Sequence, residues 1–157
     1  DIGVTGVQTC ALPISLAACD LGLSVILTEP TTWLGGQSSS QGVPPDENPW
    51  IEHTGCTRRY RAYRDAIRAR AGVQNPGGGW VSRLCHTPID GARVFEEMTA
   101  PHRAPGKLTV LLECEPMGAE TLEDAITTVR LRQRGTDIPV ASRFVLDATE
   151  KIGRAHV

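Results

Sequence analysis

Residues 22–30 read GLSVILTEP, and this stretch decides the fold. Residues 23–29 carry branched apolar side chains on both faces, which is typical of a buried strand in a parallel sheet. Pro30 ends the strand, and Gly22 is a natural C-cap for a short helix over residues 15–21. A helix, a glycine, a buried strand and an acid in this order predict the second half of a β-α-β unit.

Glu29 closes this strand, and its position indicates contact with a nucleotide. In dinucleotide-binding folds, the acid that ends the second strand accepts hydrogen bonds from ribose hydroxyls, and a carboxylate can accept two of them at once. An acid that only marks the end of a strand is the alternative. The glycine-rich phosphate loop should lie roughly 20 residues earlier. There, Gly6 and Ala11 fit its first and third positions, but Gln8 stands where the second glycine belongs.

Length and composition exclude several classes of protein. The 157 residues are 40% hydrophobic, with a formal net charge of -2, which fits one ordinary domain and not a basic nucleic-acid binder. The longest apolar run is far shorter than the roughly 20 residues needed to cross a membrane. The 5 cysteines contain no CxxC pair, which excludes zinc-ribbon and thioredoxin-type sites and favours reduced thiols in the cytoplasm. The first residues do not resemble a signal peptide.

The rest of the chain predicts further elements around this strand. Helices are expected over residues 57–70 and 89–100, the second one ended by Pro101. Strands are expected over residues 108–113, 125–134, 138–143 and 144–147, with a turn at 135–137. The pattern predicts an α/β fold in which strands 23–29, 108–113 and 144–147 form a parallel sheet with helices. Residues 125–143 would add a small antiparallel crossover.

Both ends of the chain look foreign to the rest. Residues 4–14 (VTGVQTCALPI) and 152–157 (IGRAHV) resemble translated adapters of short-read DNA sequencing. We therefore predict that residues 1–14 and 151–157 are artefacts and that residues 15–150 are authentic protein. The first strand of the sheet would then be missing or replaced by adapter residues. Two ordinary protein ends are the alternative.

Five stretches carry a resemblance to a known family: GLSVILTEPTTWLGGQ (22–37), QGVPPDENPWIE (41–52), GCTRRYRAYRD (55–65), NPGGGWVSRLCH (75–86) and FVLDATE (144–150). They resemble the N-terminal part of bacterial FAD-dependent oxidoreductases of the glutathione-reductase-like FAD/NAD(P)-binding superfamily. The resemblance implies that residues 15–150 are a partial Rossmann-like FAD-binding domain of a longer flavoprotein. Such a protein uses FAD to transfer hydride or electrons, and its small-molecule substrate is left open, as are a catalytic acid or base and the oligomeric state.

The resemblance also implies a set of cofactor contacts, namely Gly6, Glu29, Pro30, Gly35, Gly36, Gln37, Met117, Ala148 and Thr149. Glu29 would hold the adenosine ribose, and Gly35, Gly36 and Gln37 would pass beside the diphosphate and the ribityl chain. The segment Glu115-Pro116-Met117 would lie against the adenine, and Ala148-Thr149 near the pyrophosphate. Because the two artefact ends damage the phosphate loop and the far end of the sheet, we expect the chain to bind FAD weakly or not at all.

The predicted helix over residues 57–70 suggests a different function. Six arginines lie between residues 58 and 70, at positions 58, 59, 61, 64, 68 and 70. They form either a solvated helix face or a patch that docks a polyanion or an acidic partner. A small α/β binding module is therefore the alternative to a flavoprotein fragment, and a non-functional truncated fragment is a further one. The net acidic remainder of the chain argues against nucleic acid as the partner.

Several cysteines, histidines and tryptophans are weaker candidates for a site. Cys85 and His86 are adjacent, and neighbours in an extended segment point opposite ways, which disfavours a nucleophilic dyad. Cys56 with His53 lacks a third metal ligand, so no metal site is expected. The tryptophans at positions 33, 50 and 80 either pack over the isoalloxazine or fill the core.

Overall fold

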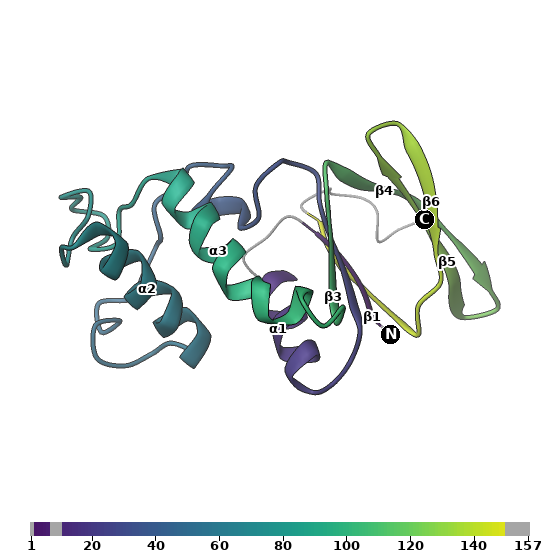
Figure 1. The fold of residues 1–157 in the computed structure, drawn as a ribbon, viewed down its shortest axis with the longest axis horizontal. Helices are drawn as coiled ribbons and strands as arrows, with labels where there is room; N and C mark the ends of the chain where they lie inside the picture. The colour runs from purple at the N-terminus through teal and green to yellow at the C-terminus, as the bar shows by residue number, and fades with distance from the viewer. Residues whose placement is uncertain (1, 7–10, 150–157) are drawn as a thin grey trace.

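A four-stranded parallel sheet forms the middle layer of the protein (Figure 1). The computed structural model describes residues 2–6 and 11–149. The order of the sheet is β3 (Leu108–Leu112), β2 (Val25–Glu29), β1 (Ile2–Gly6) and β7 (Phe144–Ala148). This arrangement confirms the predicted α/β fold, including the parallel strands near residues 23–29, 108–113 and 144–147.

Helices cover one face of this sheet, and a second sheet covers the other (Figure 1). Helices α1 (Ala11–Asp20) and α3 (Pro88–Arg103) pack on the parallel strands, and α2 (Arg58–Ala71) packs on α3. The antiparallel sheet consists of β4 (Cys114–Leu122), β5 (Ala125–Gln133) and β6 (Thr136–Val140). The 3-10 turn η1 (Gly36–Ser38) follows β2 and contacts α3.

Side-chain alternation along β2 explains how the sheet is buried on both faces. Val25 and Leu27 belong to the core beneath the helices. Ile26 points to the other face, where it packs against the second core under the antiparallel sheet. Because successive side chains of a strand point to opposite faces, Glu29 lies on the same face as Val25 and Leu27. The decisive stretch of sequence therefore places its acid on the helix side of the sheet.

Residues 2–6 occupy the position of the first strand. β1 pairs in parallel with β2 on one side and with β7 on the other. The sheet is therefore not missing its central strand, and the strand is formed by residues from the segment that we predict to be an artefact. That predicted origin of residues 1–14 and 151–157 remains a prediction. Gln8 lies outside the described residues.

Several elements differ from the sequence-based expectation, among them β6, which covers Thr136–Val140 and not residues 138–143. Helix α1 begins at Ala11 instead of residue 15, with Pro13 in its first turn, where a proline costs little. Helix α3 continues through Pro101 to Arg103, because proline removes a single N–H and the Ala104 N–H still bonds to Ala100 O at 3.2 Å. The strand β4 was not expected at all. It contains Pro116 and Gly118, which usually interrupt strands, and its pairing is irregular between these two residues.

The described helices also bear on the membrane question. Within residues 2–6 and 11–149, none of them combines the length and the apolar character that a membrane crossing requires.

Candidate functional site

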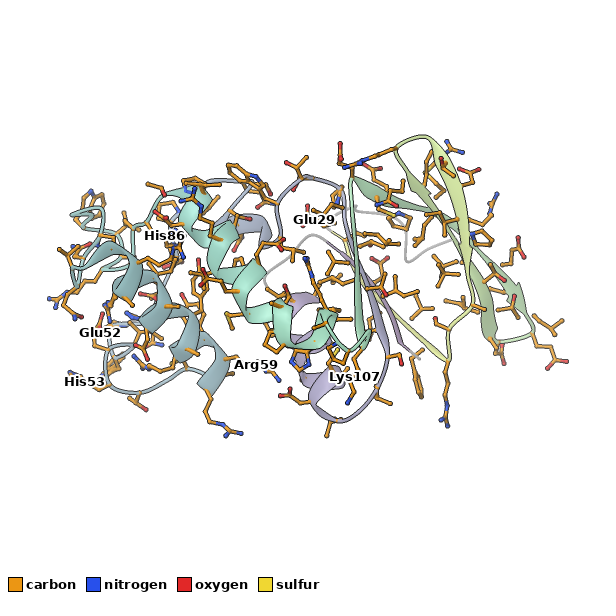
Figure 2. The ribbon with its side chains drawn as sticks, in the orientation of Figure 1. Glu29, Glu52, His53, Arg59, His86 and Lys107 are labelled. Carbon is orange, nitrogen blue, oxygen red and sulfur yellow. The ribbon has the colours of Figure 1, made fainter. Side chains whose placement is uncertain are left out.

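The strongest candidate site lies at the carboxyl edge of the parallel sheet. In the register of the strands, Gly6 stands beside Ala148, Thr5 beside Thr28, and Glu29 beside Leu112. The ends of β1, β2 and β7 thus come together at one edge. Figure 2 shows Glu29 at the end of the strands opposite to Lys107, which precedes β3. Ligands of open α/β sheets bind outside the carboxyl ends of the strands.

Glu29 is a buried carboxylate that Thr31 holds through one of its two oxygens. Its side chain is 2% exposed. Oε1 accepts hydrogen bonds from the Thr31 backbone N–H at 2.9 Å and from Thr31 Oγ1 at 2.7 Å. Both of these hydrogen bonds are to Oε1, so Thr31 engages one of the two carboxylate oxygens. Burial raises the pKa of Glu29, and the two hydrogen bonds from Thr31 lower it in part. The group is therefore a hydrogen-bond acceptor that lacks a solvent shell.

Thr149 supplies a second unsatisfied polar group at the same edge. Its Oγ1 is buried without a hydrogen-bond partner in the part of the chain that the structure describes, although its backbone N–H bonds to Asp147 Oδ1 at 2.9 Å. A buried hydroxyl without a partner costs free energy. Helix α1 begins with Ala11, and β1 ends with Gly6 at this edge. An acceptor, a hydroxyl and a helix N-terminus fit a ligand that carries both hydroxyl groups and phosphates.

The turn after β2 lies close to the helices because two glycines allow it. Gly35 has φ 115 and Gly36 has φ 51, a region that other residues rarely adopt. A Cβ at Gly35 would lie 2.2 Å from Phe95 Cε2. Both glycines are buried and Gln37 is exposed, so the predicted turn 35–37 is present. The turn borders a cavity of about 50 Å³ between α1, α2 and α3, which is also lined by Ser38, Tyr63 and Phe95.

The structure says less about two other predicted cofactor contacts, Pro30 and Met117. Pro30 is half-buried next to Glu29. Met117 lies on β4, 45% exposed, where the strand pairing is irregular. The junction of β3 and β4 does reach the Glu29 end of the sheet, because the Glu113 N–H bonds to Thr31 O at 3.0 Å. The contact of Met117 with an adenine remains a prediction.

Helix α2 turns most of its arginines toward the protein. Of its six arginines, five make side-chain contacts within the chain: Arg59, Arg61, Arg64, Arg68 and Arg70. Arg64 is fully buried, and it pairs with Glu52 at 2.7 Å and with Glu47 at 3.2 Å. Arg68 bonds to both oxygens of Glu52 at 2.9 and 2.8 Å. These pairs neutralise most of the positive charge, which disfavours the binding of a polyanion at this helix.

The ion pairs also affect the acidity of Glu52, which lies beside α2 (Figure 2). Hydrogen bonds from Arg68 and the charge of Arg64 together lower the pKa of Glu52 to about 2, and burial opposes them in part. Glu47 completes the network by accepting hydrogen bonds from Tyr60 Oη at 2.7 Å and Ser82 Oγ at 3.1 Å. The network fastens the loops before and after α2 to the helix, so its role is structural.

The weaker candidates do not form sites of their own. Cys85 Sγ bonds to Ser82 O at 3.2 Å, whereas the His86 ring bonds to Tyr63, so the two neighbours form no dyad. Among the described residues, no cluster of three potential metal ligands occurs. The interpretation of the tryptophans as core residues is wrong, because those at positions 33, 50 and 80 are 36%, 66% and 95% exposed. The described cysteines are all free, and Cys10 lies outside the described residues.

Two side-chain interactions of the structure were not predicted from the sequence. Thr31 holds Glu29, and a hydroxyl residue two positions after the acid is the local signal that could have revealed it. Tyr63 Oη lies 2.7 Å from His86 Nε2, although the two residues are 23 positions apart in the sequence. No periodicity or motif connects residues so far apart on different elements, and only the packing of α2 against α3 brings them together.

Comparison with known proteins agrees with this geometry. Residues 1–152 match the sequence profile of the family described as FAD dependent oxidoreductase. A search among curated protein sequences finds no match. Among solved structures, the myxobacterial chondrochloren halogenase CndH, a variant of FAD-dependent halogenases, aligns with a TM-score of 0.60 at 16% identity over 98% of this chain and 38% of its own.

Two further structures share the fold. A geranylgeranyl bacteriochlorophyll reductase-like protein from Thermoplasma acidophilum aligns with a TM-score of 0.56 at 14% identity, over 95% of this chain and 38% of its own. THI4 from Thermovibrio ammonificans has a TM-score of 0.53 at 10% identity, over 94% and 56%. At these identities the likeness shows the fold alone. The chain spans about 38% of the length of the CndH halogenase and about 38% of the length of the reductase-like protein.

Proposed function

Because the chain belongs to the FAD dependent oxidoreductase family, we propose that it is the FAD-binding part of a flavoprotein oxidoreductase and that the carboxyl edge of its parallel sheet holds the cofactor. One observation carries the proposal. The buried Glu29 carboxylate and the Thr149 hydroxyl, which has no hydrogen-bond partner among residues 2–6 and 11–149, lie at one edge of the sheet. When bound, FAD supplies the hydride or electron transfer, and the protein supplies binding and orientation.

The residues at this edge have distinct tasks in the proposed site. Glu29 Oε2 accepts hydrogen bonds from the adenosine ribose, while Thr31 fixes Oε1 and thereby the orientation of the carboxylate. The N-terminus of α1 and the hydroxyl of Thr149 face the diphosphate, where backbone N–H groups stabilise negative charge. Gly35 and Gly36 keep the turn beside the ribityl chain free of side chains. Gly6, Pro30, Gln37, Met117 and Ala148 belong to the proposed site by their places in the sequence.

A titration with FAD tests the proposal. The chain and its Gln8→Gly variant, which restores the second glycine of the phosphate loop, are mixed with FAD and the flavin fluorescence is followed. We expect Gln8→Gly to bind at least tenfold more tightly than the unchanged chain. Placed in the Gln8→Gly background, Glu29→Gln and Thr149→Val should each lower the affinity by about tenfold, because each removes a hydrogen bond to the ligand.

Thr28→Val is the matched control. Thr28 is also a buried threonine whose Oγ1 has no partner within the described part of the chain, but it lines the small cavity between the two sheets. Its replacement should leave the FAD affinity unchanged. If the folded Gln8→Gly chain shows no saturable binding up to 1 mM FAD, or if Thr28→Val and Thr149→Val weaken binding equally, the proposed site is wrong.

The finer assignments belong to the same proposal. We place the protein in the glutathione-reductase-like superfamily, as one part of a longer flavoprotein that acts on a small-molecule substrate. The free cysteines within residues 11–149 support a reducing cytoplasm as its compartment. The inward pairing of the α2 arginines supports this function over a binding module built on that helix.

A further inference from the structure

A single residue joins the parallel sheet to the antiparallel sheet. β3 ends at Leu112 and β4 begins at Cys114, so Glu113 forms the whole connection between them. Its backbone has φ 53, in the left-handed region that residues other than glycine rarely adopt. A backbone in this conformation persists only where the surrounding structure holds it, and such residues are common at functional sites. Figure 1 shows that β3 passes into β4 at the end of the sheet where Figure 2 shows Glu29.

The conformation of Glu113 allows a contact with Thr31. The Glu113 N–H donates to Thr31 O at 3.0 Å. Thr31 in turn donates its own N–H and its hydroxyl to Oε1 of Glu29, at 2.9 and 2.7 Å. Pro30, which lies between these two residues in the sequence, has no N–H that could tie the segment to the sheet. The Glu29 carboxylate is therefore linked through one threonine to the connection between the two sheets.

The antiparallel sheet holds Glu113 from its other side. In the turn after β5, Gln133 Nε2 donates to Leu112 O at 2.8 Å. The Arg134 N–H donates to Glu113 O at 3.3 Å, and Arg134 Nε donates to Glu113 Oε2 at 2.6 Å. Because the two paired side chains are 70% and 38% exposed, their ion pair contributes little to stability. The backbone of Glu113, fixed from both sides, is therefore the part that matters for Thr31.

We propose that Glu113 is a positioning residue for the cofactor, an inference that rests on the proposed function. Its left-handed backbone aims the N–H at the carbonyl of Thr31, and Thr31 keeps the Glu29 carboxylate in the orientation that accepts the ribose hydroxyls. Glu113 acts through Thr31 and not by a contact of its own with the ligand. The antiparallel sheet thereby has a task at the cofactor site, because it fixes the connection from which Glu113 donates.

Replacement of Glu113 by valine and by glycine tests the role of its backbone. The FAD affinity is measured by flavin fluorescence in the Gln8→Gly chain. Valine is β-branched and incompatible with φ 53, so Glu113→Val should lower the affinity about fivefold, because the carboxylate loses its fixed orientation. Glycine adopts this φ without strain and keeps the N–H, so Glu113→Gly should stay within about twofold. An equal loss in both variants would assign the effect to the side chain and overturn the inference.

Glu123→Val is the matched control. Glu123 also has φ 53, but it lies at the opposite end of β4, in the turn that leads to β5. Glu123→Val should lower the midpoint of urea unfolding about as much as Glu113→Val does, while its FAD affinity stays within about twofold. If the two valine variants weaken FAD binding equally, a general loss of stability explains the effect and Glu113 positions nothing. Glu113→Ala and Glu123→Ala, which are strained to a lesser degree, give the same comparison in case valine prevents folding.

Combination with Glu29→Gln shows whether Glu113 acts through the carboxylate. In the Gln8→Gly chain that also carries Glu29→Gln, Glu113→Val should change the FAD affinity by less than about twofold, whereas an independent structural effect would add in full. A full additional loss would contradict the route through Glu29. If FAD binds and Glu29→Gln weakens it but Glu113→Val does not, the inference is wrong and the proposed function stands. If FAD does not bind to the folded Gln8→Gly chain, the proposed function is wrong, and the inference goes with it.

Discussion

At the scale of single residues, the candidate site contains polar side chains whose burial is energetically unfavourable. Glu29 is a carboxylate at 2% exposure, and no arginine, lysine or histidine in the described part of the chain pairs with it. The Thr149 hydroxyl finds no hydrogen-bond partner among the residues that the structure describes. Buried groups of this kind lower stability unless a ligand completes their hydrogen bonds, so their presence at one edge is an indication of function and not of packing.

Glu29→Gln should therefore have opposite effects on stability and on binding. Burial raises the folded-state pKa of Glu29 above 4.5, so its contribution to stability falls as the pH rises through that pKa. The glutamine carries no charge and can still accept the hydrogen bonds of Thr31. We expect urea unfolding at pH 7 to show a variant that is more stable than the natural chain, with a difference that shrinks toward pH 4. A variant that is less stable at pH 7 would contradict the unpaired burial of this carboxylate.

Gly35 should be the least replaceable glycine of the turn. Gly35→Ala would hold φ 115 with a Cβ that lies 2.2 Å from Phe95 Cε2. We expect a loss of about 3 kcal/mol in the free energy of unfolding, from backbone strain and the steric overlap together. Gly72→Ala is the control, because its φ is 69 but nothing lies within 4 Å of the added Cβ. It should lose only about 1 kcal/mol. Equal losses would mean that Phe95 moves away freely.

At the scale of elements, α2 is a helix whose arginines form ion pairs with other parts of the same chain. Its sequence pattern predicted both its position and its basic character, and Thr57 caps it as a hydroxyl residue should. The pattern could not show that Arg64 is buried, because the two glutamates that pair with it come from the preceding loop. Likewise, β4 was hidden by Pro116 and Gly118, since local propensity carries no information about the strand that pairs with it.

Removal of the buried arginine should destabilise the protein strongly. Arg64→Met leaves Glu47 without its arginine partner in a position where its side chain is 4% exposed, and the loss of one partner of a buried ion pair costs about 3–5 kcal/mol. Arg58→Met, on the exposed side of the same helix, should change the stability by less than about 0.5 kcal/mol. Thermal and urea unfolding measure both. A cost below that of Arg58→Met would show that the network contributes nothing.

The same network predicts a dependence of stability on acid. The pKa of Glu52 falls from 4.5 to about 2 in the folded state. Its contribution to stability is therefore complete above pH 4.5 and is lost as the pH falls through about 2. Glu52→Gln should show a smaller decrease in stability over this range than the natural chain, as measured by urea unfolding at a series of pH values. Parallel curves for the two proteins would contradict the role of Arg68 as the partner.

At the scale of the whole molecule, two cores meet on opposite faces of one sheet. The larger lies under the helices, and the smaller consists of Cys114, Val129, Leu131 and Val140, packed against residues of the parallel sheet. The sequence predicted the parallel sheet and an antiparallel crossover, because strand patterns are local. It could not predict that the crossover folds back over the sheet, since that depends on which apolar faces remain uncovered.

The smaller core should be sensitive to truncation. Leu131 is 2% exposed and Leu122 is 69% exposed, and both lie on strands of the antiparallel sheet. Leu131→Ala should lower the free energy of unfolding by about 2–5 kcal/mol, and Leu122→Ala by less than about 0.5 kcal/mol. Chemical denaturation of the two variants checks this. If both leave the stability unchanged, the antiparallel sheet does not contribute to the cooperative unit.

The pairing of Gly6 with Ala148 links positions at opposite ends of the described chain. During synthesis, β1, β2 and the helices emerge long before β7, so a partly made chain has Glu29 in place but lacks Thr149. Contacts of such large sequence separation form late, because the loop between them must close first. A cofactor that needs both sides would be captured only by completed chains. The yellow colour of a bound flavin would then show that synthesis of the chain is complete, in addition to showing that the protein holds its cofactor.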